Sequence, residues 1–401
     1  MKIHKFKAVQ ESIMKICFIT YSIFDLGGIQ RVTSVISSEL SKNHDVEIVC
    51  TNTNQECNRE LYNLSDNVKV NFNNLLKKNM ITKATCKIFK ELNKKFGILN
   101  NKRIIKLMTQ VYYPTNVQNQ FIEFINNNKY DVVIGVGGEY SLLLGIIAER
   151  VNCKTIGWQH NSFDAYLKTK GRYFWNQDEL FKEYISNLDN HIVLTEYDCA
   201  RYKEEMNINS DVIYNPKSFS SIEKSNVSSK QFLAAGRFNY QKGFDLLIES
   251  FNEFCKNNQE WNLVIVGEGE EREKIAETIR RYNLEDRIRI DKFTTNIKEY
   301  FLSSSVLLLP SRWEGMPMIV LESFEMGVPV VAYNISAAKQ LIGNNNEGIL
   351  VEKYNFKEFS EAMLKMTDEK QRIEISKNTI RKSKEFEVSV IIKKWNKLLG
   401  L

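Results

Sequence analysis

Two glutamates, Glu314 and Glu322, stand eight positions apart in the segment 311–322, which follows the apolar run VLLLP. Pro317 suits the first turn of a helix, where its missing N–H removes no hydrogen bond. We therefore expect a helix that places Glu314 in the loop at its mouth and Glu322 about one and a half turns inside. The start of such a helix attracts a diphosphate, and the carboxylates could accept hydrogen bonds from sugar and ribose hydroxyls. Taken alone, the pair also suits one helix cap and one surface residue.

A second cluster follows the strand-like run QFLAA, in the sequence Gly236-Arg-Phe-Asn-Tyr-Gln-Lys-Gly243. Gly236 permits a tight turn, and Gly243 begins the next helix. Arg237 and Lys242 bracket the loop, where two fixed cations could neutralise a departing nucleotide diphosphate as metal ions do elsewhere. An isolated motif of this kind would also fit two solvated loop cations.

Glycines mark two further turns. Gly27 and Gly28 lie between the run KICFIT and a helical pattern, where they would let a phosphate approach the backbone. A glycine pair is also common in plain turns. Gly267 and Glu268 follow a strand in the second half of the chain, and a base or ribose could rest against their backbone.

His160 comes directly after the strand-like segment Lys154–Trp158, and the chain has only four histidines. The carboxyl ends of strands in α/β sheets are where ligand contacts concentrate. His160 could hydrogen-bond a donor sugar or stabilise developing charge, although a structural histidine would look the same.

Other chemistries find no support in the sequence. No Cys/His cluster has zinc spacing, and no D-x-D, G-x-S-x-G, H-E-x-x-H or Walker A sequence is present. We therefore expect neither a metal nor another cofactor. The seven cysteines are scattered without pairing motifs, which favours a reducing, cytoplasmic compartment.

The elements that must position these residues alternate between β-rich runs and helical patterns, which predicts parallel βαβ units. The segment 216–230 is rich in Ser, Lys and Asn and is interpreted as a linker. It separates a domain of residues 1–215 from one of residues 231–384. The predicted strands are Lys15–Thr20, Val46–Cys50, Val68–Phe72, Asp131–Val136, Lys154–Trp158, His191–Thr195, Asp211–Tyr214, Gln231–Ala235, Asn262–Val266, Arg287–Ile290, Val306–Leu309, Val328–Ala332 and Gly348–Val351.

The size and charge of the chain agree with two globular domains. Its 401 residues exceed the length of about 250–300 at which one core stops growing. A net charge of +6 is too modest for a nucleic-acid-binding protein. No apolar run reaches the length of about 18 residues that spans a bilayer. Residues 1–13 lack the pattern of a signal peptide and suggest a disordered arm, or a start at Met14.

A basic segment occupies residues 75–106. Between Lys77 and Lys106 there are ten Lys or Arg residues and one acid, Glu91, so that 10 − 1 = +9. Apolar residues are interleaved with these charges, a pattern that suits an anionic membrane surface. A solvated helical face over an ordinary core is the alternative.

Together these motifs resemble the retaining glycosyltransferases of family 4, which have the GT-B fold. The resemblance runs from about residue 14 to the end of the chain. The sequences that carry it are Gly27-Gly28, Trp158-Gln-His160, Gly236-Arg-Phe-Asn-Tyr-Gln-Lys-Gly243, Val266-Gly-Glu-Gly269, Glu314-Gly-Met-Pro-Met-Ile-Val-Leu-Glu322 and Gly327-Val-Pro-Val-Val. It implies two Rossmann-like, doubly wound α/β domains facing a central cleft, with an acceptor-binding N-terminal domain. It also implies that the last segment, 385–401, crosses back onto that domain.

The resemblance also implies roles in the C-terminal domain. Arg237 and Lys242 would hold the donor diphosphate, Glu314 would face the transferred sugar, and Glu322 would bind the ribose. Gly315 and Met316 would offer their backbone to the sugar or phosphate.

In the N-terminal domain, Gly27 and Gly28 would line the phosphates, and His160 would contact the sugar. Two positions differ from the family pattern. An acid is common after the glycine pair, where this chain reads Gly28-Ile-Gln-Arg31, and a Phe-x-Gly loop is usual where it reads Phe293-Thr-Thr-Asn296.

The implied reaction transfers a hexose or N-acetylhexosamine from a nucleotide diphosphate sugar, of the UDP type, with retention of configuration. The implied acceptor is a lipid-linked or surface-polysaccharide intermediate at the inner face of a bacterial membrane. Two other functions stay open: a nucleotide-sugar 2-epimerase on the same scaffold, and a non-catalytic membrane-surface binding protein.

Overall fold

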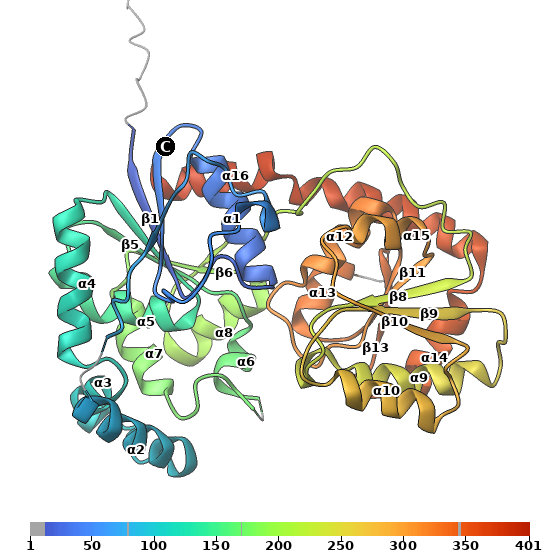
Figure 1. Cartoon of the computed structure of the whole chain (residues 1–401), viewed down its shortest axis with the longest axis horizontal. Helices are drawn as coiled ribbons and strands as arrows, with labels where there is room; N and C mark the ends of the chain where they lie inside the picture. Colours follow the sequence, from blue (N-terminus) through green and yellow to red (C-terminus); the bar gives the residue numbers. More distant parts are fainter. Residues whose placement is uncertain (1–12, 78–79, 170, 344–345) are drawn as a thin grey trace, which may run out of the picture.

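The computed structural model describes residues 13–77, 80–169, 171–343 and 346–401, and it contains two α/β domains side by side (Figure 1). Of the arm predicted for residues 1–13, only Ile13 lies within the described residues. No helix within these ranges is both long and apolar enough to cross a membrane.

The N-terminal domain is built on a seven-stranded parallel sheet with the order β3-β2-β1-β4-β5-β6-β7. Its strands are β1 (Lys15–Thr20), β2 (Asp45–Cys50), β3 (Lys69–Phe72), β4 (Val132–Val136), β5 (Lys154–Trp158), β6 (Asn190–Val193) and β7 (Asp211–Val212). Its helices are α1 (Gly28–Leu40), α2 (Met80–Phe96), α3 (Ile105–Tyr112), α4 (Thr115–Asn128), α5 (Gly138–Ile147), α6 (Phe163–Leu167), α7 (Asp178–Tyr184) and α8 (Glu196–Met206). The central strands β1 and β4 are almost wholly buried because helices cover both faces of the sheet.

The C-terminal domain repeats this design with a six-stranded parallel sheet in the order β10-β9-β8-β11-β12-β13. Its strands are β8 (Gln231–Ala235), β9 (Asn262–Val266), β10 (Ile288–Asp291), β11 (Val306–Leu309), β12 (Val330–Tyr333) and β13 (Gly348–Val351). Its helices are α9 (Phe244–Cys255), α10 (Arg272–Arg281), α11 (Ile297–Leu302), α12 (Met318–Met326), α13 (Ser336–Ile342), α14 (Phe356–Lys365) and α15 (Glu369–Ser383). The strand order reverses between β8 and β11, so their following loops line a crevice where such sheets bind ligands.

Most predicted strands appear within one or two residues of their predicted ends, but the strand predicted at Asp211–Tyr214 is shorter. It stops after Val212 as β7. The next aromatic residue, Tyr214, packs its ring 5.9 Å from that of Phe386 instead of continuing the sheet. Helix α12 begins at Met318, so Pro317 caps the helix and does not lie in its first turn.

The last helix, α16 (Val388–Leu399), crosses from the C-terminal domain to the N-terminal domain (Figure 1). Trp395 is fully buried there, with its ring 4.9 Å from Trp158 and 6.4 Å from Phe18. Lys154 Nζ donates to the backbone carbonyl of Leu398 at 2.6 Å. The core of the first domain is therefore completed by the end of the chain.

Candidate active site

The loop after β8 holds Lys242 against the loop after β11. Asn239 accepts a hydrogen bond from the backbone N–H of Lys242 at 3.2 Å and so caps a short 3-10 turn. Lys242 Nζ lies 2.6 Å from Glu314 Oε1, to which Ser311 Oγ also donates at 2.7 Å. Only 7% of the Glu314 side chain is exposed, against 20% for Lys242. Two residues predicted from separate motifs therefore form one charge pair.

Arg237 reaches across to the other domain. Its Nη2 donates to the backbone carbonyl of Leu26 at 2.8 Å, directly before Gly27 and Gly28. The structure thus brings the second predicted cation to the predicted glycine loop. Arg237 therefore contacts the other domain directly, whereas Lys242 pairs with Glu314 within its own domain.

Tyr62, which the sequence analysis did not identify, holds the glycine loop. Its hydroxyl accepts from the N–H of Gly27 at 2.8 Å and donates to the carbonyl of Asp25 at 3.2 Å. Burial raises the pKa of Tyr62, although the N–H of Gly27 and the charges of Arg31 and Arg237 oppose that rise. The phenol is therefore a neutral clamp at the domain contact. No signal in the sequence linked it to Gly27, 35 positions away.

The starts of two helices, one from each domain, are neighbours at this clamp. Gly28 begins α1, and a Cβ added there would lie 3.4 Å from Met318 Cγ at the start of α12. Each helix start carries unpaired N–H groups and a partial positive charge. Arg237 donates to Leu26, two residues before the start of α1, so the contact suits an anionic ligand.

The carboxylate of Glu322, inside α12, is paired with side chains from other parts of the chain. Its side chain is 2% exposed and forms an ion pair with Arg31, in the first turn of α1. Ser218 Oγ donates to the same carboxylate oxygen at 2.5 Å. The sequence analysis named Arg31 only as the end of the segment Gly28-Ile-Gln-Arg31, which lacks the acid that is common after the glycine pair. Its position three residues after Gly28, on the same helix turn, is the signal that could have found it.

His160 is buried at the end of β5. Its ring lies 4.2 Å from that of Trp158, and its backbone N–H donates to the Tyr166 hydroxyl at 3.3 Å. Burial lowers the pKa of His160 to about 3, so the ring is neutral at physiological pH. Within the described residues, no hydrogen-bond partner meets its Nε2. The ring can therefore offer a neutral hydrogen bond, and stabilisation of charge by an imidazolium is disfavoured.

Gly315 and Met316 lie directly against the N-terminal domain. A Cβ on Gly315 would come within 2.2 Å of the carbonyl oxygen of His160. Met316 is 6% exposed, and the backbone N–H of Asn215 points to its Sδ at 3.2 Å. Both residues therefore form the interdomain contact, and their backbone contacts to a sugar or phosphate stay a prediction.

The loops after β8 and β9 lie side by side and meet at Gly236, Gly267 and Glu268. A Cβ on Gly267 would lie 2.0 Å from the carbonyl oxygen of Gly236, so only glycine fits there. The carbonyl of Glu268 accepts from the N–H of Phe238 at 2.8 Å. The carboxylate of Glu268 lies 3.5 Å from Arg272, within its own domain. The backbone of this loop thus supports the Arg237 loop, and a base or ribose contact stays a prediction.

Metal ligands were not predicted for this site. In the part of the chain that the structure describes, no three His, Cys, Asp or Glu side chains gather as a metal ion would require. The predicted absence of a metal cofactor remains a prediction.

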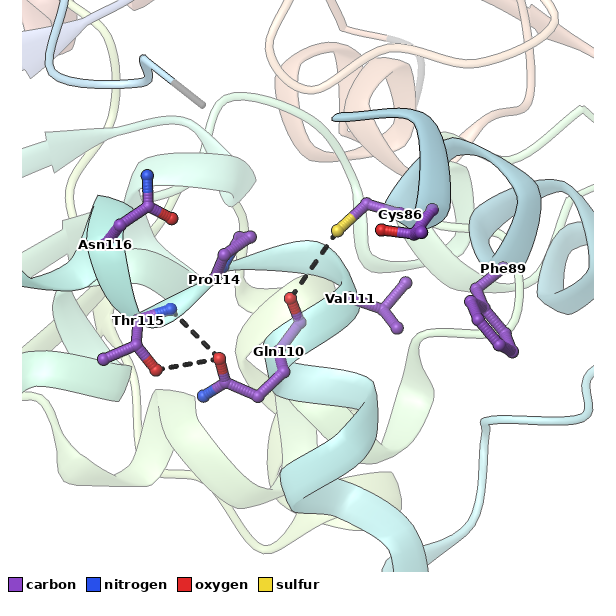
Figure 2. Close-up of a pocket in the computed structure, with 8 residues that line it drawn as sticks. Cys86, Phe89, Gln110, Val111, Pro114, Thr115 and Asn116 are labelled. Atoms are coloured by element: carbon purple, nitrogen blue, oxygen red, sulfur yellow. Dashed lines mark hydrogen bonds between the residues drawn. The ribbon is translucent and has the colours of Figure 1, made fainter. Parts of the chain in front are cut away.

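A cavity of about 410 Å³ lies apart from these residues, between α2 and the junction of α3 and α4 (Figure 2). Figure 2 shows the Gln110 carbonyl accepting from Cys86 Sγ, and the Gln110 side chain accepting from both the N–H and hydroxyl of Thr115. None of the predicted site residues lines it. We place the candidate site at the interdomain contact, because the predicted charged residues and the starts of α1 and α12 lie there and not at this cavity.

Comparison with known proteins finds one matching family model and several relatives. Residues 217–385 match the family described as glycosyl transferases group 1. The amylovoran biosynthesis glycosyltransferase AmsD of Erwinia amylovora is 27% identical over 402 residues, covering 96% of this chain and 99% of the relative. An α-1,4-N-acetyl-D-galactosaminyltransferase of Campylobacter jejuni, whose named acceptor ends in PP-undecaprenol, is 25% identical over 97% of this chain and 99% of the relative.

Among solved structures, a TarM variant of S. aureus in complex with UDP superposes with a TM-score of 0.74 at 15% identity. The match covers 97% of this chain and 100% of that one. At this identity the likeness shows the fold, which is the GT-B arrangement of two Rossmann-like domains expected from the sequence.

Proposed function

We propose that this chain, a transferase with a glycosyltransferase group 1 domain, moves a hexose or N-acetylhexosamine from a nucleotide diphosphate sugar to a lipid-linked or surface-polysaccharide acceptor. The proposal includes retention of the anomeric configuration. One observation carries it: Arg237 contacts the loop before α1, Lys242 pairs with Glu314 in the loop before α12, and the starts of these two helices, Gly28 and Met318, are neighbours. Such a set of fixed positive groups fits a diphosphate leaving group without a metal ion.

The proposed mechanism depends on charges fixed before the reaction. As the bond between the sugar and the β-phosphate breaks, negative charge grows on the diphosphate. The ammonium of Lys242 is held by Glu314 and the guanidinium of Arg237 by the carbonyl of Leu26, so both charges are in place before the reaction. The acceptor hydroxyl would attack the anomeric carbon on the face that the diphosphate leaves, and the departing β-phosphate would take its proton.

Glu314 and His160 would position the sugar instead of attacking it. Glu314 is engaged by Lys242 and Ser311, which makes it a poor free nucleophile. The neutral His160 ring can hydrogen-bond a sugar hydroxyl. This arrangement favours a direct transfer over a covalent glycosyl-enzyme intermediate.

The relatives support the choice of donor and acceptor. The TarM structure contains UDP, and the Campylobacter relative is named for transfer of N-acetylgalactosamine to an undecaprenyl-linked glycan. The Erwinia relative is named for biosynthesis of amylovoran. We therefore propose a UDP-sugar donor and an acceptor used in polysaccharide assembly, at the cytoplasmic face of the membrane.

The test is transfer from a panel of UDP-sugars to undecaprenyl-linked acceptors by the wild type, Lys242→Ala and a control, Lys256→Ala. Lys256 is a solvent-exposed lysine of the same domain, paired with Glu253 on the surface. Lys242→Ala should lower kcat by about 10²–10³-fold with an unchanged circular dichroism spectrum, and the control should match the wild type. Near-normal turnover by Lys242→Ala would contradict the mechanism. Product formation from donor alone would instead favour the 2-epimerase.

The surface of α2 supports a membrane location. Its inner side is fixed by Asn93, which is fully buried and donates to the carbonyl of Asn176 at 2.8 Å. On its outer side Ile88, Leu92 and Phe96 recur every fourth residue and are 60%, 38% and 63% exposed. Exposed lysines flank this stripe, namely Lys83, Lys87, Lys94 and Lys95. An apolar stripe that faces outward between cations fits an anionic bilayer better than a solvated helix over a core.

Flotation with phosphatidylcholine vesicles, with and without 30% phosphatidylglycerol, tests this surface. The wild type should bind the anionic vesicles, and binding should be lost in Ile88→Ser/Phe96→Ser and weakened in Lys87→Gln/Lys94→Gln/Lys95→Gln. Ile373→Ser, which changes a 42% exposed isoleucine of α15, is the control. Equal flotation of all variants, or none by the wild type, would contradict the membrane proposal while leaving transfer untouched.

A further inference from the structure

Arg31 stands at the boundary between the two domains in a position that the proposed function does not use. It lies in the first turn of α1, and its guanidinium is 5.5 Å from the ring centre of Tyr62, the clamp of the glycine loop. Its side chain is 20% exposed, so it has access to solvent at the domain contact.

The partner of Arg31 is the buried acid of the other domain. Glu322 is 2% exposed and would be costly to bury as an anion without a cation beside it. The ion pair joins residues 291 positions apart and therefore exists only when the domains are together. Arg31 thus neutralises the carboxylate that would otherwise repel an approaching diphosphate.

The surroundings of Arg31 are those of the proposed phosphate site. Gly28, three residues earlier on the same helix, lies against Met318 at the start of α12. The guanidinium of Arg237 donates to the carbonyl of Leu26, in the loop that leads into α1. The charges of Arg31 and Arg237 both act on the Tyr62 hydroxyl. A diphosphate held at these helix starts would therefore lie within reach of both guanidinium groups.

We propose that Arg31 is a third donor-binding cation, supplied by the N-terminal domain, and that donor binding exchanges its partner. Without donor, Arg31 pairs with Glu322. With donor, Arg31 turns to the diphosphate and Glu322 accepts from the ribose hydroxyls, so both groups stay paired in each state. This inference rests on the proposed function, because it assumes a nucleotide diphosphate at the site.

Inorganic pyrophosphate is the probe that separates the two roles, since it carries neither base nor ribose. Its affinity is measured by calorimetry for the wild type, Arg31→Gln, Glu322→Gln and the double variant. Arg31→Gln should bind about tenfold or more weakly, because a guanidinium–phosphate contact is lost. Glu322→Gln should bind several-fold more tightly, because Arg31 no longer has a competing partner. Arg31→Lys should recover part of the lost affinity because it restores the charge but not the planar fork.

The decisive comparison is between Glu322→Gln and the double variant. There the buried carboxylate is absent from both proteins, and only the contact of Arg31 with pyrophosphate differs. The double variant should bind about tenfold more weakly than Glu322→Gln. Equal affinities would show that Arg31 acts only by neutralising Glu322, and would overturn the inference.

The control variant is Lys42→Gln, which removes the same charge from an exposed lysine just beyond the other end of α1. It should bind pyrophosphate like the wild type. If the wild type and this control bind neither pyrophosphate nor UDP, the proposed function fails and the inference fails with it. If both bind and Arg31→Gln binds equally well, only the inference fails.

Discussion

Gly315 lies so close to His160 that a methyl group on its Cα would sit 2.2 Å from the carbonyl oxygen of His160. The two residues belong to different domains, and each follows the carboxyl end of a central strand. The absence of a side chain at position 315 therefore sets how closely the domains meet at the candidate site.

Gly315→Ala should separate the domains without unfolding them. The added carbon cannot coexist with the present contact, and a shift of about 1 Å at a reacting centre can cost about 10²-fold in rate. We expect transfer to fall by at least about tenfold, with an unchanged circular dichroism spectrum and a larger radius of gyration by X-ray scattering. Gly28→Ala, whose carbon would meet Met318 at the ordinary distance of 3.4 Å, should keep the wild-type radius. An unchanged radius in Gly315→Ala would show that the contact is not tight.

Buried histidines should make the N-terminal domain sensitive to acid. Burial lowers the pKa of both His160 and His191 to about 3, whereas the unfolded chain has a value near 6.5. The unfolded state therefore binds more protons between these values, so stability is complete above about pH 6.5 and is lost as the pH falls toward 3. Each histidine should contribute about 1.4 kcal/mol per pH unit in that window.

Urea unfolding of the wild type and His160→Gln at pH 7, 6, 5 and 4, followed by tryptophan fluorescence, measures this slope. The free energy of unfolding of His160→Gln should fall less steeply with decreasing pH, because one of the two buried histidines is absent. Parallel curves for the two proteins would mean that the ring of His160 is protonated as easily in the folded protein as in the unfolded chain.

A buried ion network fixes the linker to the C-terminal domain. Lys217 and Glu325 are each 4% exposed and 2.6 Å apart, and Lys224 and Glu387 extend the network. Burial raises the pKa of Glu325, but the hydrogen bonds from the two lysines outweigh it and lower the pKa overall. Its contribution to stability is therefore present at neutral pH and is lost as the pH falls.

Glu325→Gln should destabilise the protein by about 3–5 kcal/mol, because the charge of Lys217 stays buried without its main counter-charge. Lys217→Met/Glu325→Leu should recover most of this loss, since it removes both buried charges. Chemical unfolding of the three proteins decides the matter. Equal stability of Glu325→Gln and the wild type would mean that water reaches the lysine.

Trp395 should anchor the last helix. Trp395→Ala removes a fully buried ring that packs against both Phe18 and Trp158, and it should cost about 3–5 kcal/mol. Helix α16 should then become open to limited proteolysis after Glu387. The control is Val390→Ala on the same helix, where the side chain is 39% exposed. Resistance of Trp395→Ala to cleavage would show that other contacts hold the helix.

The sequence by itself determined the two sheets and the loops that carry the candidate site. Strands such as Lys154–Trp158 and Asn262–Val266 are short apolar runs bounded by polar or glycine residues, and the structure has them with the predicted bounds. Each candidate motif follows such a run. Local periodicity and turn chemistry therefore sufficed to place Lys242 and Glu314 at the carboxyl ends of their strands.

Tertiary structure alone decided which partners these residues have. The pairing of Arg31 with Glu322 joins positions 291 apart, and the protonation of His160 depends on how completely other segments bury it. The exposure of Ile88 and Phe96 on α2 likewise depends on which face packs inward. Such contacts arise from the packing of two domains against each other, and no local pattern in the chain encodes the distance between groups that meet only after folding.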